Sequence, residues 1–148
     1  MDRDHRTRKA GDPRVGVLRV LGVVFLARVC AQLVQRIHEV SWLPSFDAWQ
    51  SGALPYPLLV TAQVAIIIAM VVIIARAARG QTTLRAGALR IVSALGIAYF
   101  VLMAIRLVAG LTVADDGSWF DNPLPSLFHL VLATFVLCWV SVDRSRER

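Results

Sequence analysis

Four apolar stretches dominate the pattern of hydrophobic and polar positions along the chain. They cover about residues 15–38, 56–76, 88–112 and 123–142. A transmembrane helix needs about 20 predominantly apolar residues. Such a span is helical because lipid offers no hydrogen bonds to open backbone N–H and C=O groups. We therefore predict an all-α integral membrane protein, a four-helix bundle in which each stretch crosses the bilayer once.

The connections between these stretches contain residues that start and end helices. Pro55 and Pro57 frame the start of the second stretch, and Asn122-Pro123 supplies a cap and a first-turn proline for the fourth. The connection between the first two stretches is apolar and aromatic, with Trp49 among its residues. Aromatic side chains gather at the membrane–water interface. We expect an aromatic outer loop or a short interfacial helix there. A more specific hypothesis is that this segment covers a pocket.

The distribution of charge predicts the orientation. The chain has 16 Lys and Arg against 10 Asp and Glu, a net charge of +6. The basic residues gather in residues 1–14, in the connection after the second stretch and in residues 143–148, whereas the other two connections contain neither Lys nor Arg. By the positive-inside rule, both basic tails and the middle connection are cytoplasmic. The charge is thereby a topology signal, and we expect no nucleic-acid partner.

A polar stripe runs along one face of the first stretch. With Arg28 at zero and about 100° per residue, Gln32, Gln35, Arg36 and Glu39 all fall between about −20° and +80°. An arginine at the centre of the bilayer costs about 2.5–3.5 kcal/mol even on the lenient insertion scale. The stripe is therefore expected to face the bundle interior or a water-filled cavity.

The other three stretches each place a polar side chain in the predicted outer half, namely Gln63, Arg106 and His129, with Tyr99 on the same face as Arg106. Two interpretations remain open: a network that holds the bundle together, or a pocket open to the outer leaflet. The surplus positive charge of that pocket suits a lipid phosphate, a carboxylate or a quinone carbonyl. The candidate ligand-binding residues are Arg28, Gln32, Gln35, Arg36, Glu39, Arg106 and His129.

Three functions are compatible with such a pocket. The first is a ligand-binding or accessory protein that holds a membrane lipid or a quinone, or that docks a membrane-protein partner. The second is a membrane-embedded redox or lipid-modifying enzyme, and the third is a small transporter. The sequence contains no Ser/His/Asp arrangement, metal-ligand cluster or glycine-rich phosphate loop. No catalytic residue and no cofactor is assigned for this reason.

The first stretch also carries a family resemblance. It reads Leu18-Arg19-Val-Leu-Gly22-Val-Val-Phe25-Leu26 and continues with the polar residues Arg28 and Gln32. This segment resembles the start of DoxX-like proteins, which are small four-helix membrane proteins of bacteria, and the plan of four helices with cytoplasmic termini is similar too. The resemblance implies a multi-pass protein of the bacterial plasma (inner) membrane. It also implies quinone-linked redox chemistry, with which some members are associated.

Overall fold

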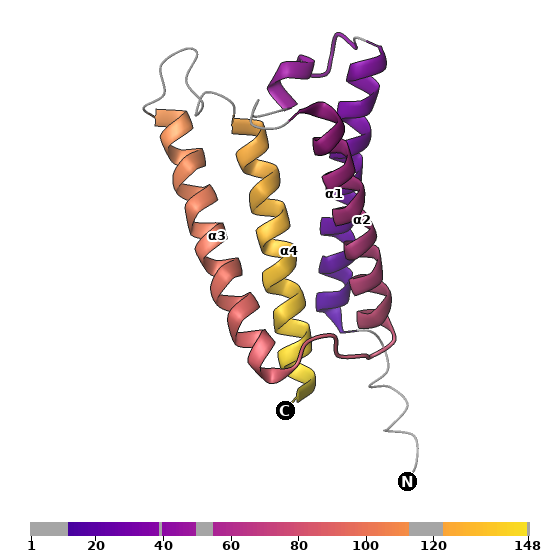
Figure 1. Ribbon diagram of the computed structural model, residues 1–148, viewed down its shortest axis with the longest axis vertical. Coiled ribbons are helices and arrows are strands. Elements are labelled where there is room, and N and C mark those ends of the chain that lie inside the picture. Colours follow the sequence, from indigo (N-terminus) through magenta and orange to yellow (C-terminus); the bar gives the residue numbers. More distant parts are fainter. Residues whose placement is uncertain (1–11, 39, 50–54, 113–122, 148) are drawn as a thin grey trace.

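The computed structural model describes residues 12–38, 40–49, 55–112 and 123–147, and these residues form helices and their connections. The four long helices are α1 (Pro13–Ile37), α2 (Tyr56–Ala78), α3 (Ala86–Thr112) and α4 (Pro123–Glu147), with a short 3-10 helix, η2 (Phe46–Trp49), between the first two (Figure 1). Each long helix is apolar enough and long enough to cross a membrane. This confirms the predicted all-helical architecture of a multi-pass membrane protein.

Helices α2 and α4 begin at the predicted prolines, whereas α1 begins about two residues before its predicted start. Asp12 caps α1 because its side chain accepts a hydrogen bond from the backbone N–H of Arg14 at 3.0 Å. Pro13 and Pro123 open α1 and α4, positions at which the missing proline N–H costs nothing. One boundary differs clearly: α4 continues to Glu147, about five residues beyond the predicted end, so most of the predicted basic tail is helical.

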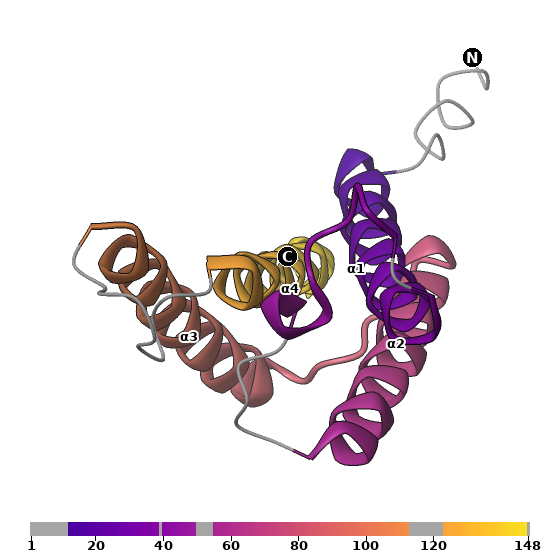
Figure 2. The same cartoon turned by 90° about the horizontal axis from the view of Figure 1, so that it is seen from above.

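Helix α4 lies at the centre of the arrangement. It contacts α1, α2, α3 and η2, whereas α3 packs against α4 and no other helix of the described chain. Seen from above, α3 and α2 lie on opposite sides of α4 (Figure 2). The main hydrophobic core joins α1, α2 and α4, and its buried members include Leu18, Phe25, Met70 and Phe135. Helix α3 therefore lies outside the α1–α2–α4 core.

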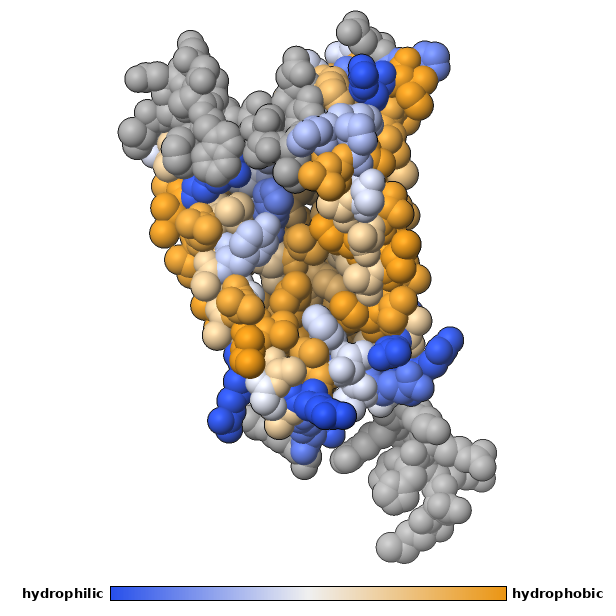
Figure 3. Space-filling model, viewed as in Figure 1, coloured by the Kyte–Doolittle hydropathy of each residue, from blue (hydrophilic) through white to orange (hydrophobic). Residues whose placement is uncertain are grey.

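The outer surface of the helices is apolar, as a lipid-facing surface must be. Val20, Val23, Ile91 and Leu95 are each more than 60% exposed. A broad hydrophobic band covers the middle of the molecule, and hydrophilic residues gather toward its two ends (Figure 3). Because the four long helices alternate in direction, the start of α1, the α2–α3 connection and the end of α4 share one end of the molecule (Figure 1). We call this the terminal end, and the opposite one the η2 end.

A buried carboxylate fastens the terminal end. Asp143 of α4 is 1% exposed. Its Oδ2 accepts hydrogen bonds from the backbone N–H of Thr83 at 2.9 Å, the Thr83 hydroxyl at 2.6 Å and the backbone N–H of Leu84 at 2.9 Å. The Trp139 indole N–H in turn donates to the Thr83 hydroxyl at 2.6 Å. These bonds tie the last turns of α4 to the segment that leads into α3, which explains why the helix persists past the apolar stretch.

Replacing Asp143 by Ala is expected to lower the free energy of unfolding by about 3 kcal/mol, because three donors lose a charged acceptor at a buried position. The measurement is the denaturant midpoint of the purified protein in micelles. Glu147→Ala is the matched control, because this carboxylate is exposed on the same helix, and a change within about 0.5 kcal/mol is expected. Equal effects of the two substitutions would contradict the role given to Asp143.

Candidate functional site

A buried arginine forms the centre of the candidate site. Arg28, near the middle of α1, is 9% exposed. Its Nη2 donates a hydrogen bond to the backbone carbonyl of Trp49 at 2.8 Å, and its guanidinium lies over the ring of Phe128, 5.4 Å from the ring centroid. Its Nε is buried and has no hydrogen-bond partner in the described part of the chain. This donor is unsatisfied within the described residues, and Arg28 is among the residues that line the cavity described below.

Helix η2 folds over this arginine. The Trp49 side chain is 6% exposed, and its indole N–H donates to the carbonyl of Pro44 at 3.0 Å. The indole stacks on the Phe128 ring of α4, with the centroids 6.2 Å apart and the planes 22° from parallel. Viewed from above, η2 lies beside α4, over the side that faces α1 and α2 (Figure 2). Helix η2 thus packs against α1 and α4.

Two glutamines join α1 to α2 next to Arg28. Gln32 is 1% exposed and Gln63 is 5% exposed. The Nε2 of Gln63 donates to the Oε1 of Gln32 at 3.0 Å, while the Nε2 of Gln32 is buried without a partner among the described residues. One turn further along α1, the Oε1 of Gln35 accepts from the backbone N–H of Val40 at 3.0 Å. Gln35 thereby holds the chain that leaves α1.

These elements enclose a cavity of about 170 Å³ between α1, η2, α2 and α4. Its polar lining consists of Arg28, Gln63 and His129, and the rest is apolar or aromatic, including Trp49 and Phe128. We call it the η2-end cavity. Ligand sites of drug size occupy about 300–1,000 Å³. This cavity therefore has room for a single ring or a small head group, with any remaining part of the ligand outside it.

A hydrogen bond connects the cavity to α3. The Tyr99 hydroxyl of α3 lies 2.6 Å from the Nδ1 of His129 on α4, and the two rings meet edge to face with centroids 5.9 Å apart. His129 lines the cavity while Tyr99 does not. The Tyr99 hydroxyl therefore fixes the orientation of the His129 imidazole from the α3 side. The pair can carry a proton between the cavity and the α3–α4 interface.

The structure brings together only part of the predicted set. Arg28, Gln32 and Gln35 are buried, as the stripe on α1 predicts. Arg36 is exposed instead and lies over the rings of Phe46 and Tyr56, 5.3 and 5.6 Å from their centroids. It stands at the edge of the predicted stripe, where a small rotation turns a side chain outward, so its placement inside the pocket is wrong. Glu39 lies outside the described residues.

Arg106 is also separated from the cavity. It is 7% exposed, yet no residue of α3 lines the cavity, because α3 packs against α4 alone. The prediction grouped Arg106 with Arg28 by its expected depth in the membrane, but depth does not determine which helices are neighbours. The sequence analysis did not identify Phe128, whose ring contacts both the Arg28 guanidinium and the Trp49 indole. In the sequence Phe128 resembles any other apolar residue of its stretch. Its position next to His129 was the one available signal.

The glutamine pair yields a testable prediction. Gln32→Leu and Gln63→Leu are each expected to lower the free energy of unfolding by about 1 kcal/mol, because each leaves a buried amide without its partner. The double substitution is expected to cost less than the sum of the two, since both polar groups are then gone. SDS titration of the protein in mixed micelles measures all four states. Effects that add to within about 0.3 kcal/mol would contradict a direct interaction.

Comparisons with protein-family models, with curated proteins and with solved structures find no match for this chain. The chemistry of the site therefore has to be inferred from its own contacts. Those contacts give a buried guanidinium with one donor that lacks a partner among the described residues, two aromatic rings and a hydrogen-bonded histidine around one small cavity.

Proposed function

We propose that this small integral membrane protein binds the head group of a quinone-type lipid in the η2-end cavity. The observation that carries the proposal is Arg28, a buried cation whose Nε lacks a partner among the described residues and which borders an otherwise largely apolar cavity. A carbonyl oxygen accepts a charge-assisted hydrogen bond from such a donor. The DoxX-like resemblance suggests the same ligand class.

The aromatic lining supports a flat ring as the ligand. Trp49 and Phe128 already stack on each other, and aromatic rings favour offset stacking or edge-to-face contact with a further ring. Arg28 and His129 provide polar contacts for oxygen atoms on such a ring. A phosphate head group fits less well, because it would exchange its hydration for one cation in a space of about 170 Å³.

The proposed orientation places this cavity toward the outer leaflet of a bacterial-type plasma membrane, with both termini in the cytoplasm. Arg76, Arg79, Arg85 and Arg90 lie at the end of α2, in the following connection and at the start of α3. Lys and Arg are missing from the described part of the connection that contains η2. This asymmetry supports the positive-inside assignment. The isoprenoid tail of the ligand would then extend into lipid.

The direct test is the binding of ubiquinone-1 to purified protein in micelles, measured by isothermal titration calorimetry. Arg28→Gln is expected to weaken binding about tenfold or more, because it removes a charge-assisted hydrogen bond. Arg36→Gln is the matched control, an exposed arginine on the same helix, and it should change the affinity less than twofold. Equal loss in both variants, or no binding to the wild type, would overturn the proposal.

A second pair of variants tests the cavity without touching a charge. Ala62→Phe fills the cavity from α2, since Ala62 is part of its lining. Ala65→Phe adds the same side chain at an exposed position on α2 that does not line the cavity. Only the first substitution is expected to abolish ubiquinone-1 binding. Retained binding in Ala62→Phe would place the ligand elsewhere.

A membrane-embedded redox enzyme is the second candidate, and the 2.6 Å contact between Tyr99 and His129 favours it. A quinol gives up two protons and two electrons when it is oxidised, so a histidine with a hydrogen-bonded relay at the cavity suits that reaction. With ferricyanide as the electron acceptor, an enzyme would oxidise ubiquinol-1 faster than protein-free micelles do, and Tyr99→Phe would slow it. A wild-type rate equal to that of the micelles identifies a binding protein.

A further inference from the structure

A second cavity lies at the terminal end of the molecule and has no part in the proposed quinone site. It measures about 600 Å³ and is bounded by the first turns of α1, the last turn of α2 with Gly80, and Arg146 of α4. Among the described residues, three arginines contribute to its lining, Arg19, Arg79 and Arg146, against one carboxylate, Asp12. We call it the terminal cavity. Its size and lining suit a charged group rather than a packed side chain.

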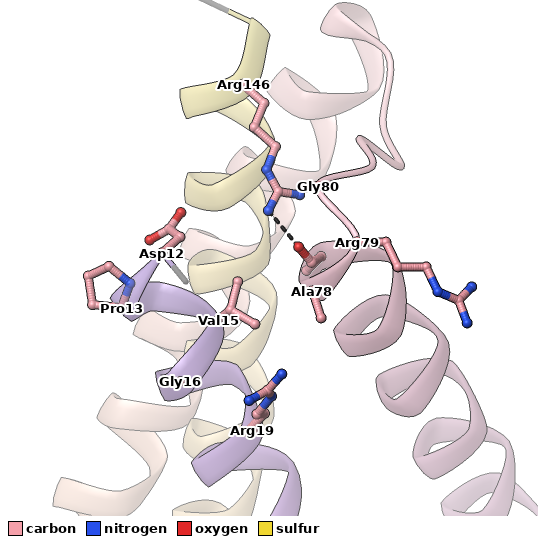
Figure 4. A pocket seen from close by; sticks show the side chains of 10 residues that line it. Asp12, Pro13, Val15, Gly16, Arg19, Ala78, Arg79, Gly80 and Arg146 are labelled. Atoms are coloured by element: carbon pink, nitrogen blue, oxygen red, sulfur yellow. Dashed lines mark hydrogen bonds between the residues drawn. The ribbon is translucent and has the colours of Figure 1, made fainter. Parts of the chain in front are cut away.

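The cations of the terminal cavity are held in different ways. Arg146 is fixed by hydrogen bonds from its Nη1 to the carbonyl of Gln81 at 3.0 Å and from its Nη2 to the carbonyl of Ala77 at 2.6 Å. Figure 4 shows Arg146 reaching from α4 toward the end of α2, and Arg19 projecting from α1 toward the same space. The Arg79 side chain extends from the rim away from it (Figure 4). Two guanidinium groups from different helices therefore border one space.

The single acidic group does not neutralise them. Asp12 already accepts the capping hydrogen bond from the backbone N–H of Arg14 at 3.0 Å. Its one negative charge stands against the two guanidinium groups, Arg19 and Arg146, that border the cavity. Basic pockets between transmembrane helices at the cytoplasmic side are sites for the head groups of anionic lipids. A free phosphate ion would satisfy the same charges, so a further observation has to distinguish a lipid from an ion.

That observation is an apolar groove that continues from Arg19. A cavity of about 190 Å³ lies between α1 and α2 and is lined by Arg19 and otherwise by apolar residues, among them Gly22, Val23, Leu26, Ile67, Val71 and Ile74. Arg19 is the one residue shared with the terminal cavity. A Cβ at Gly22 would lie 3.0 Å from the Ile74 Cδ1, so α1 and α2 pack closely at this point of the groove.

The geometry points to a binding site for one anionic phospholipid, which we propose as an additional site of this protein. The phosphate lies in the terminal cavity between Arg19 and Arg146, and one acyl chain follows the groove between α1 and α2. Arg19 lines both regions, and its aliphatic stem can lie along the groove while its charge reaches the phosphate. This arrangement requires both a negative charge and an apolar chain in the same ligand.

The experiment is native mass spectrometry of the full chain released from micelles that contain dioleoyl phosphatidylglycerol or dioleoyl phosphatidylcholine. One phosphatidylglycerol is expected to stay bound, at an apparent affinity at least fivefold above that of phosphatidylcholine. Arg19→Gln is expected to remove about fivefold of that affinity. Arg90→Gln is the control, because Arg90 is exposed near the start of α3 at the same end of the molecule but lines neither cavity; it should leave the affinity unchanged.

Tryptophan substitutions test the groove. Val23→Trp obstructs it, whereas Val20→Trp adds the same bulk one turn earlier on α1, outside the lining. Val23 is 64% exposed and Val20 62%, so both variants are expected to fold. Only Val23→Trp should reduce the binding of dioleoyl phosphatidylglycerol.

Inorganic phosphate and glycerol phosphate, added as competitors, distinguish an ion from a lipid. Neither is expected to displace the lipid at millimolar concentration. Displacement by either one, or unchanged lipid binding in Val23→Trp, would show a site for phosphate alone and overturn the lipid proposal. Equal retention of the two phospholipids by the wild type, or equal affinity in Arg19→Gln and Arg90→Gln, would overturn it as well.

Discussion

The cost of exposing a guanidinium to hydrocarbon constrains the η2 end of this protein. Arg28 lies near the middle of α1, where turning it toward lipid would cost several kcal/mol by the lenient insertion scale. The rotation of α1 about its axis is thereby fixed, and Gln32 and Gln35 turn inward with it. Once inside, the cation needs acceptors, and the Trp49 carbonyl and the Phe128 ring provide them. Because the buried Arg28 guanidinium needs these partners, its contacts hold α1, η2 and α4 together.

Helix α4 connects the two ends of the molecule through its polar contacts. At the η2 end it supplies Phe128 and His129. At the terminal end its Asp143 binds the backbone of the α2–α3 connection and its Arg146 binds the backbone at the end of α2. Between these ends, Gly96 lets α3 approach closely, since a Cβ there would come within 3.0 Å of the Leu137 Cδ2. Helix association in lipid has no hydrophobic driving force. Polar contacts at both ends and close apolar packing between them therefore hold the helices together.

The two cavities lie at opposite ends of the molecule and differ in chemistry. The η2-end cavity is small, mostly apolar and bordered by a buried cation, which suits the ring of an apolar lipid. The terminal cavity is larger and bordered by arginines near the ends of the helices, which suits a charged head group. Their lining residues do not overlap. The two proposals are therefore independent, and the failure of either one leaves the other standing.

The sequence by itself determined the four membrane spans and the inward face of α1, because hydrocarbon imposes strict rules on length and charge. Only the tertiary structure decided which helices are neighbours. Surfaces that face lipid and surfaces that face another helix are both apolar. Hydropathy therefore cannot predict that α3 packs against α4 and against no other described helix. For the same reason the hydropathy pattern did not predict that Arg106 lies apart from Arg28 or that Arg36 points outward. It also did not identify Phe128 as the ring that contacts the Arg28 guanidinium. Those choices depend on side-chain packing between helices distant in sequence.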